Sequence, residues 1–192
     1  MKTNKLFIAI MIAFAGFVSA QQQGDYSKEP GYFDFGDITL LKSGEMSTEV
    51  YLEEPLLKMI SQMGKSEEEG FGQLVENLKL VKVNEFEVNL ENMGKLDDAF
   101  SSIDKTLQSK KWQRIIKTKQ NNTLANVYVK PGSGNSFDGM VVTALDNKGK
   151  VTLVNIVGKI DLASIGKLSS HFHFPGMGKM KEGEKMKEKE DK

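Results

Sequence analysis

Hydrophobic positions along the chain recur with two spacings, and each spacing predicts a type of secondary structure. Alternating apolar and polar residues from Thr48 predict an extended strand. Pro55 suits the first turn of a helix that follows this strand, and Gly64 is a suitable residue for its end. The apolar stripe of that helix consists of Leu56, Leu57, Ile60 and Met63. The patterned part of the chain therefore opens with a strand followed by a helix.

A second, short helix and a second strand are predicted next. Ser66 and Glu69 have the spacing of a capping box, in which each side chain accepts a hydrogen bond from the backbone of the first turn. The apolar face of this helix is formed by Phe71, Leu74, Val75 and Leu78. Residues 78–88 are then rich in strand-forming residues, which predicts an extended segment.

The most regular helical pattern lies between residues 96 and 107. One face is apolar, and the other carries charged residues such as Asp97, Asp98 and Lys105. The apolar face consists of Leu96, Ala99, Phe100, Ile103 and Leu107. This pattern predicts an amphipathic helix that packs one side against a core.

Four extended segments follow that helix, at residues 112–119, 124–130, 137–145 and 151–157. Short connections rich in Gly, Asn and Asp separate them. Connections this short predict antiparallel hairpins, because a parallel crossover requires a dozen or more residues. A last short helix is expected after Asp161, and its inward side chains are expected to be Leu162, Ile165 and Leu168.

The order of these elements predicts an α+β domain, in which helices pack on one face of a mostly antiparallel sheet. We expect a single domain over residues 30–170, preceded by a flexible lead-in at residues 21–29. Within the domain, residues 30–41 are too apolar for a linker and are expected to pack on the body. Residues 171–192 are rich in charge and lack a periodic apolar face, which is typical of a disordered tail.

The first 20 residues have the pattern of an export signal. Lys2 and Lys5 precede an apolar run over residues 6–18, and the small residues Ser19 and Ala20 follow it. The run is too short for a membrane span, which needs about 20 apolar residues. We therefore expect a signal peptide that is cleaved near Ala20, and a soluble exported protein in the periplasm or outside the cell.

The balance of basic and acidic residues limits the kinds of partner that the protein can bind. The chain has 26 basic and 26 acidic residues, and removal of residues 1–20, which include Lys2 and Lys5 and no acidic residue, leaves 24 and 26. A domain without excess positive charge is a poor ligand for nucleic acid. Residues 179–192 contain six Lys and five acidic residues, too small an excess to anchor the tail to a membrane at about 1 kcal/mol per cation. We expect neither a nucleic-acid partner nor a stable membrane anchor.

Residues that could carry out catalysis or bind a metal are scarce. The chain has no cysteine, which excludes disulfides, thiol nucleophiles and lipid attachment to cysteine. His171 and His173 are the two histidines, and in an extended segment they would point the same way, as in half of a metal site. No third ligand lies near them apart from the acidic residues of the tail, so they are weak metal candidates. We expect no cofactor and assign no catalytic residue.

Three segments together resemble a known family of bacterial proteins. They are residues 30–35 (PGYFDF), residues 49–57 (EVYLEEPLL) and residues 154–162 (VNIVGKIDL). The chain resembles the domain-of-unknown-function 4252 family, which consists of small exported proteins of Gram-negative bacteria. The resemblance implies an envelope or extracellular protein without an established activity, and it supplies no functional residues.

Two classes of function remain open. The preferred one is an exported, non-enzymatic domain that binds an envelope protein or a small ligand. The aromatic candidates for such a surface are Trp112, Tyr128, Phe172 and Phe174, although large aromatic residues are mostly buried. The alternative is a hydrolase that uses carboxylates or a metal ion. A pocket with convergent polar groups would favour the enzyme, whereas a flat apolar patch would favour a partner surface.

Overall fold

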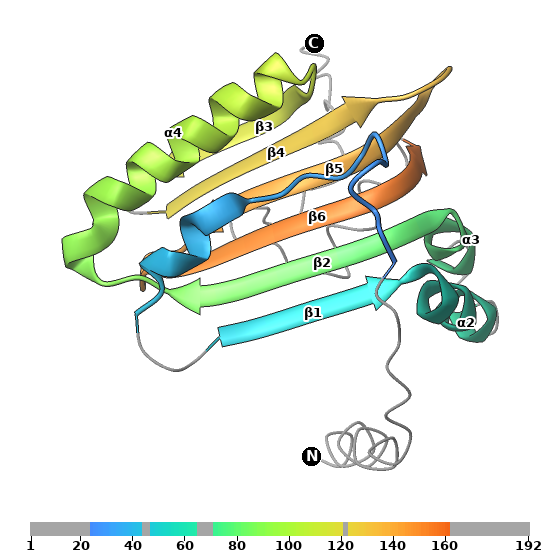
Figure 1. Cartoon of the computed structure of the whole chain (residues 1–192), viewed down its shortest axis with the longest axis horizontal. Helices are drawn as coiled ribbons and strands as arrows, with labels where there is room; N and C mark the ends of the chain where they lie inside the picture. The colour runs from blue at the N-terminus through green and yellow to red at the C-terminus, as the bar shows by residue number, and fades with distance from the viewer. Residues whose placement is uncertain (1–23, 44–46, 65–70, 121–122, 162–192) are drawn as a thin grey trace, which may run out of the picture.

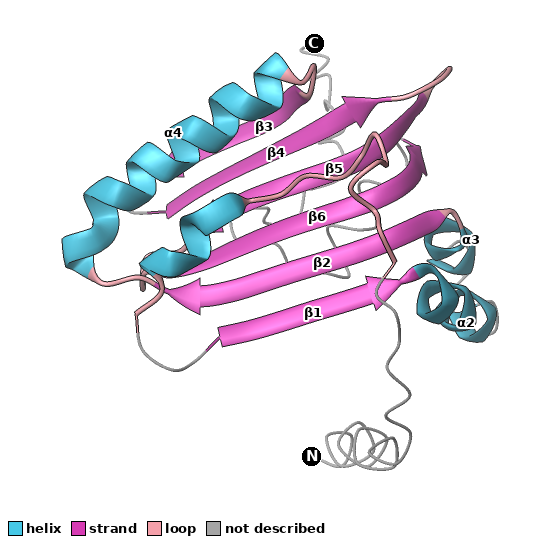
Figure 2. Ribbon diagram, viewed as in Figure 1, coloured by secondary structure: helices cyan, strands magenta, loops and turns pink. Residues whose placement is uncertain are grey.

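The computed structural model describes residues 24–43, 47–64, 71–120 and 123–161. These residues form a twisted six-stranded sheet with helices over one face and further helices beyond the end of one edge strand (Figures 1 and 2). The strands are β1 (Ser47–Glu53), β2 (Leu78–Glu87), β3 (Gln113–Gln120), β4 (Thr123–Pro131), β5 (Ser136–Leu145) and β6 (Lys150–Asp161). The helices are the 3₁₀ helices η1 (Gly36–Leu41) and η2 (Leu90–Asn92), and the α-helices α2 (Glu54–Gly64), α3 (Phe71–Glu76) and α4 (Met93–Ser109).

All neighbouring strands of the sheet are antiparallel, in the order β1-β2-β6-β5-β4-β3. Strands β3 to β6 follow one another as hairpins, as the short connections predict. The last of them, β6, lies against β2, so the β1–β2 pair and the four strands β3 to β6 join into one sheet at the β2–β6 pairing. Strands β1 and β3 form the two edges.

One face of the sheet, the helix-covered face, carries α4 and the segment that leads into η1 (Figure 1). Four residues of α4, which share one side of the helix, are buried there: Leu96, Phe100, Ile103 and Leu107. Phe33, Phe35 and Ile38 of the N-terminal segment join the same core cluster. The prediction that residues 30–41 pack on the domain is therefore confirmed.

The opposite face has its own apolar cluster. It includes Val81, Val127, Val142 and Ile156, each at most 1% exposed. Helices α2 and α3 lie beyond the end of β1, and they contribute Leu57 and Val75 to this cluster (Figure 1). The α+β class, the antiparallel sheet and the helical cover of one face are as the sequence predicts. The second cluster adds that both faces of the sheet are apolar.

Buried Asn155 of β6 fastens the N-terminal segment to the sheet. Its Oδ1 accepts a hydrogen bond from the Phe33 backbone N–H at 2.9 Å, and its Nδ2 donates to the carbonyls of Gly31 and Met140 at 2.9 and 3.3 Å. Gly31 runs so close to Asp138 and Gly139 of β5 that a Cβ atom there would collide with their backbone. The absence of a side chain at residue 31 therefore lets the segment cross the sheet.

Most predicted elements are present, with differences at their ends. Helix α3 stops at Glu76, and Leu78 is the first residue of β2, so its assignment to the apolar face of the helix was wrong. Strand pairing with β6 takes Leu78 into the sheet. Strand β6 continues to Asp161, past its predicted end at residue 157. The capping pair Ser66–Glu69 and the helix expected after Asp161 lie outside the described residues.

Residues 24–29, for which the sequence predicts a flexible lead-in, contact the end of the β1–β2 pair. The carboxylate of Glu29 binds the Lys79 ammonium at 2.8 Å. The Gly24 N–H donates to Glu53 at 3.1 Å. These contacts hold the start of the described chain against the domain.

Candidate functional site

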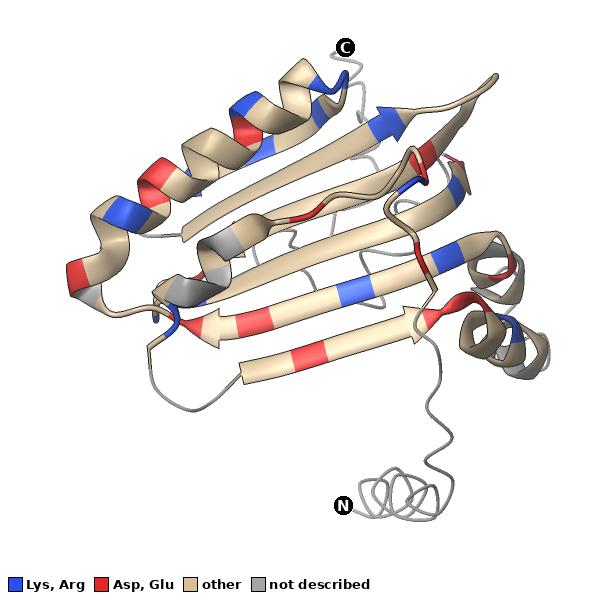
Figure 3. Ribbon diagram, in the orientation of Figure 1, with Lys and Arg blue, Asp and Glu red and all other residues tan. Residues whose placement is uncertain are grey.

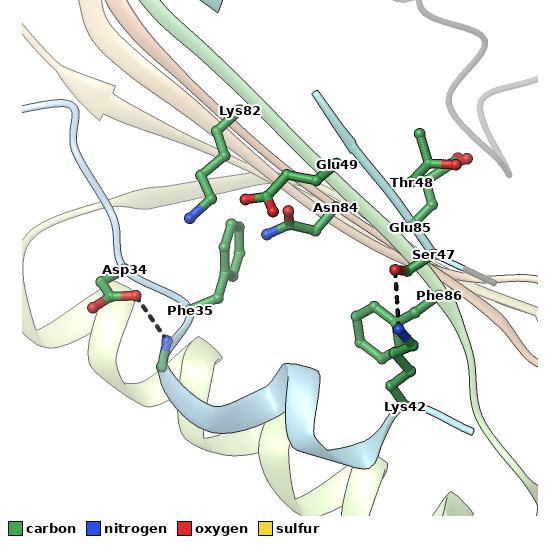
Figure 4. A pocket seen from close by; sticks show the side chains of 11 residues that line it. Asp34, Phe35, Lys42, Ser47, Thr48, Glu49, Lys82, Asn84, Glu85 and Phe86 are labelled. Carbon is green, nitrogen blue, oxygen red and sulfur yellow. Dashed lines mark hydrogen bonds between the residues drawn. The ribbon is translucent and has the colours of Figure 1, made fainter. Parts of the chain in front are cut away.

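A pocket of about 390 Å³ opens on the helix-covered face, between η1 and the β1–β2 edge of the sheet (Figure 4). Helix α4 lies over the other side of this face, near β3 and β4 (Figure 1). The pocket is therefore the part of the face that α4 does not reach. Its lining residues are Asp34, Phe35, Gly36, Lys42, Ser47, Thr48, Glu49, Lys82, Asn84, Glu85 and Phe86.

Strand geometry places three polar side chains at this pocket. Lys82 and Asn84 are two residues apart on β2, so they lie on the same face of the sheet. Glu49 of β1 lies directly opposite Asn84, which puts it on that face as well. Figure 3 shows the resulting mixture of acidic and basic residues along β1 and β2. The antiparallel register thus brings a cation, an amide and a carboxylate together.

These three side chains point toward the ring of Phe35 and leave their polar atoms free. Figure 4 shows Lys82, Glu49 and Asn84 directed into the space above that ring. Within the described part of the chain, none of the three side chains forms a hydrogen bond or an ion pair. Lys82 and Asn84 are half-buried and Glu49 is exposed. Their polar atoms are therefore available to a molecule in the pocket.

The other charged lining residues have partners already. Glu85 binds Lys150 at 2.8 Å and Thr152 at 3.1 Å, and its side chain points away from Phe35 (Figure 4). Asp34 accepts a hydrogen bond from the Gly36 N–H at 3.0 Å. Gly36 has a φ of 62°, a backbone conformation that glycine adopts without strain, and this turn begins η1. Asp34 keeps one carboxylate oxygen for further contacts.

A second polar cluster on the helix-covered face is closed, and it joins Asp104 of α4 to Arg114 of β3 and Tyr128 of β4. The Asp104 carboxylate binds the Arg114 guanidinium and the Tyr128 hydroxyl, each at 2.8 Å. Burial, together with the hydrogen bond to Asp104, raises the pKa of Tyr128 to about 12. Burial opposes ionisation of Asp104, but hydrogen bonds from Gln108 and Tyr128 and the charge of Arg114 outweigh it and lower the pKa of Asp104. Every group here has a partner, so the cluster fastens α4 to the sheet.

The aromatic residues that the sequence offers as surface candidates have other places in the fold. Trp112 is 4% exposed and Tyr128 is 1% exposed, so both belong to the core. The Trp112 ring packs edge-on against Phe33, with ring centroids 6.4 Å apart. Phe172 and Phe174 lie outside the described residues.

The metal candidates His171 and His173 also lie outside the described residues. Over residues 24–43, 47–64, 71–120 and 123–161, no group of three or more His, Cys, Asp or Glu side chains is placed to hold a metal ion. Within the same ranges, no helix is long and apolar enough to cross a membrane.

The residues that do meet at the pocket were not singled out from the sequence. Lys82 and Asn84 alternate with the apolar Val81 and Val83, a pattern that also fits a strand with one solvated face. The available signal was that Glu49, Lys82 and Asn84 fall on one side when β1 and β2 are paired. Asp34 and Phe35 reach the pocket from a distant segment, which no local pattern indicates.

A family model described as "Domain of unknown function (DUF4252)" matches residues 42–168. No curated protein and no solved structure matches the chain. The matched range contains the β1 and β2 residues of the pocket, whereas Asp34 and Phe35 precede it.

Proposed function

The chain belongs to the DUF4252 family, and from this premise we propose that it is an exported, non-enzymatic domain that binds a small ligand in the pocket between η1 and β1–β2. One observation carries the proposal: Lys82, Asn84 and Glu49 converge above Phe35 without bonding to one another. Polar groups fixed on neighbouring strands around an apolar floor are the usual composition of a small-molecule site. Polar groups of this kind are hydrated when no ligand is bound, and a ligand that makes the same hydrogen bonds can replace the water.

A polar pocket could also belong to an enzyme, so its hydroxyl groups need consideration. Lys42 donates a hydrogen bond from Nζ to Ser47 Oγ at 3.1 Å, which has the composition of a Ser–Lys catalytic pair. Both residues are exposed, however, whereas the lysine of such a pair is enclosed so that it can act as a base. The lining residues include no His. The pocket therefore supports binding better than hydrolysis.

Export is the second part of the proposal, and the N-terminal sequence supports it. Two lysines, a 13-residue apolar run and small residues before position 21 form the pattern of a cleaved signal. The domain would then act in the periplasm or outside the cell, where an envelope protein is a further possible partner. N-terminal sequencing of the protein recovered from the envelope or medium tests this part. A chain that begins at Gln21 is expected, and an uncleaved chain in the cytoplasm would contradict it.

Thermal unfolding in the presence of candidate ligands tests the binding function. The ligands are amino acids, dipeptides, sugars, nucleosides, dicarboxylates and polyamines at millimolar concentration. Wild type is compared with Asn84→Phe, which fills the pocket, and with Lys119→Phe, a matched change at an exposed position on the opposite edge strand. A ligand at ten times its Kd stabilises the native state by about 1.4 kcal/mol, which corresponds to a rise in Tm of roughly 3 to 6 °C.

We expect at least one compound to raise the Tm of wild type and of Lys119→Phe, but not that of Asn84→Phe. Compounds that stabilise all three proteins equally would place the binding site elsewhere and contradict the proposal. Failure of every compound to stabilise wild type would also count against it. Covalent labelling of Ser47 by a fluorophosphonate, which phosphonylates nucleophilic serines, would favour the hydrolase instead.

A further inference from the structure

The two free charges in the pocket have opposite signs and do not pair with each other. In the β1–β2 register, Lys82 lies opposite Tyr51 and Glu49 lies opposite Asn84, so Lys82 and Glu49 are diagonal neighbours on one face. Long side chains at diagonal positions are within reach of each other. In the structure they nevertheless form no ion pair. Both side chains instead point into the shared space above Phe35 (Figure 4).

The remaining charges that face the pocket do not neutralise these two. Glu85 is bonded to Lys150 and Thr152 on the opposite face. Lys42, which follows η1, donates one hydrogen bond to the uncharged hydroxyl of Ser47 and keeps its positive charge at the rim. Asp34, before η1, has one carboxylate oxygen engaged by its own turn and adds negative charge at the rim. A ligand therefore meets an ammonium group at Lys82 and a carboxylate at Glu49 that form no ion pair in the described chain, and a further charge of each sign at the rim, on Lys42 and Asp34.

A ligand with a single charge fits this arrangement poorly. An anion that binds Lys82 is held close to the carboxylates of Glu49 and Asp34, and a cation that binds Glu49 is held close to Lys82. Repulsion between like charges a few ångströms apart cancels much of the attraction in a partly buried site. A molecule with both a carboxylate and an ammonium group gains both attractions, because each of its charges can face its complement.

The neutral residues of the pocket fit the rest of such a molecule. The Asn84 side chain has both donors and an acceptor, so it can bind either a carboxylate or an amide. The Phe35 ring provides an apolar surface for a side chain or a face for an ammonium group. The volume of about 390 Å³ is at the lower end of the range for small-molecule sites. The pocket is thus large enough for a ligand of one or two amino acids, and too small for a folded protein.

We infer that the pocket binds a small zwitterion, a free amino acid or a dipeptide, with its carboxylate on Lys82 and its ammonium group on Glu49. The inference rests on the proposed binding function and names the class of ligand for the same site. Lys82 and Glu49 are the residues that determine specificity, and Asn84 and Phe35 support the uncharged part of the ligand.

Calorimetric titration with matched compounds tests the inference. The zwitterions are alanine, leucine, phenylalanine and their dipeptides. For each, the N-acetyl form keeps only the negative charge and the amide form keeps only the positive charge. We expect saturable binding of at least one zwitterion, and an affinity at least ten-fold lower for both of its blocked forms.

Two substitutions assign each charge to its side chain. Lys82→Gln should lower zwitterion affinity ten-fold or more and abolish the preference over the amide form, because the cation that binds the carboxylate is removed. Glu49→Gln should also lower zwitterion affinity ten-fold or more, and it should abolish the preference over the N-acetyl form, because the carboxylate that binds the ammonium group is removed. The controls, Lys95→Gln and Asp98→Asn on the exposed side of α4, should leave affinity unchanged. A merely structural role for Lys82 or Glu49 would weaken all compounds equally, and circular dichroism verifies that each variant is folded.

The possible outcomes separate the inference from the function on which it rests. Equal binding of zwitterions and blocked forms would overturn the inference. A singly charged or neutral ligand whose binding is lost in Asn84→Phe would also overturn it, while the binding function would stand. Absence of any ligand sensitive to Asn84→Phe, among these compounds and the wider set, would overturn both.

Discussion

The helix-covered face of the sheet has two halves that use polar residues in opposite ways. Under α4 the polar groups of Asp104, Arg114 and Tyr128 are bonded to one another, and the apolar residues around them are buried. Beside η1, Lys82, Asn84 and Glu49 point into open space without partners in the described chain. The difference separates a cluster that holds the fold together from one that is available to a ligand.

The half of this face beside η1, which contains the pocket and is called the hollow half below, is uncovered because the helices are narrower than the sheet. Six strands spaced by about 4.8 Å span about 24 Å, whereas one helix with its side chains is about 10 Å wide. Helix α4 therefore covers only part of the sheet. The 6-residue η1 and the segment before it cover part of the remainder. The pocket is the uncovered space beside them.

The largest expected effect is at Asn155, which fastens the N-terminal segment over both halves. Asn155→Ala leaves the Phe33 N–H and the Gly31 carbonyl buried without their partner. We expect a loss of about 3 to 5 kcal/mol in the free energy of unfolding, because each orphaned group adds its desolvation cost to that of the cavity. Urea denaturation measures it, with Asn135→Ala in the exposed hairpin loop as the control. A loss no larger than that of the control would show that the segment is held in another way.

A pair of alanine substitutions compares the two halves directly. Leu96 under α4 is completely buried, and Leu96→Ala should cost about 3 kcal/mol of stability. Asn84 beside η1 has no side-chain partner among the described residues, and Asn84→Ala should change stability by no more than about 0.5 kcal/mol. The same urea titrations provide both values. Similar losses at the two positions would mean that Asn84 is a structural residue.

A smaller effect, with a characteristic pH dependence, is expected at Tyr128. Tyr128→Phe removes a hydrogen bond to Asp104 and should cost about 1 kcal/mol at neutral pH. Because the pKa of Tyr128 is raised from 10.0 to about 12 in the fold, its contribution is complete below pH 10 and is lost as the pH rises toward 12. Wild-type stability should therefore fall more steeply than that of the variant over this interval. Parallel pH profiles for the two proteins would contradict the assignment.

The smallest effect concerns a buried polar pair that is not fully satisfied. Asn126 Nδ2 donates to Thr143 Oγ1 at 3.4 Å, while its Oδ1 has no partner among the described residues. Replacement of both residues by apolar ones of similar size, in Asn126→Leu/Thr143→Val, should leave stability unchanged or raise it by up to about 1 kcal/mol. Thermal unfolding checks the sign. A clear loss of stability would show that the pair contributes more than its geometry suggests.

The sequence predicts most of the framework because the framework depends on local periodicity. Period-two alternation located β1, and a regular apolar stripe located α4, in which four of the five predicted face residues are buried. The end of α3 was misplaced because Leu78 fits both a helical stripe and a strand, and pairing with β6 decides between them. Periodicity could not reveal the contact of Glu29 with Lys79 either, since 50 residues separate the two.

The site could not be predicted in the same way, because the pocket exists where α4 leaves part of the sheet uncovered, and local sequence does not show which part that is. Lys82 and Asn84 have the sequence pattern of solvated strand residues, and only the placement of Phe35 and η1 encloses them. Trp112 and Tyr128 are surface candidates in the sequence, yet both are buried in the core of the helix-covered face, where Trp112 packs against Phe33 and Tyr128 bonds to Asp104. In both cases long-range packing decided the outcome.

Nuclear magnetic resonance titration with the dipeptide of alanine tests most directly whether the hollow half is the binding site. We expect amide shifts at residues 34–36, 47–49 and 82–86, which surround the pocket, and none along α4. The same titration of Asn84→Phe should show no saturable shifts. Shifts centred on α4, or no saturable shift in wild type, would contradict the claim that the hollow half binds a zwitterion.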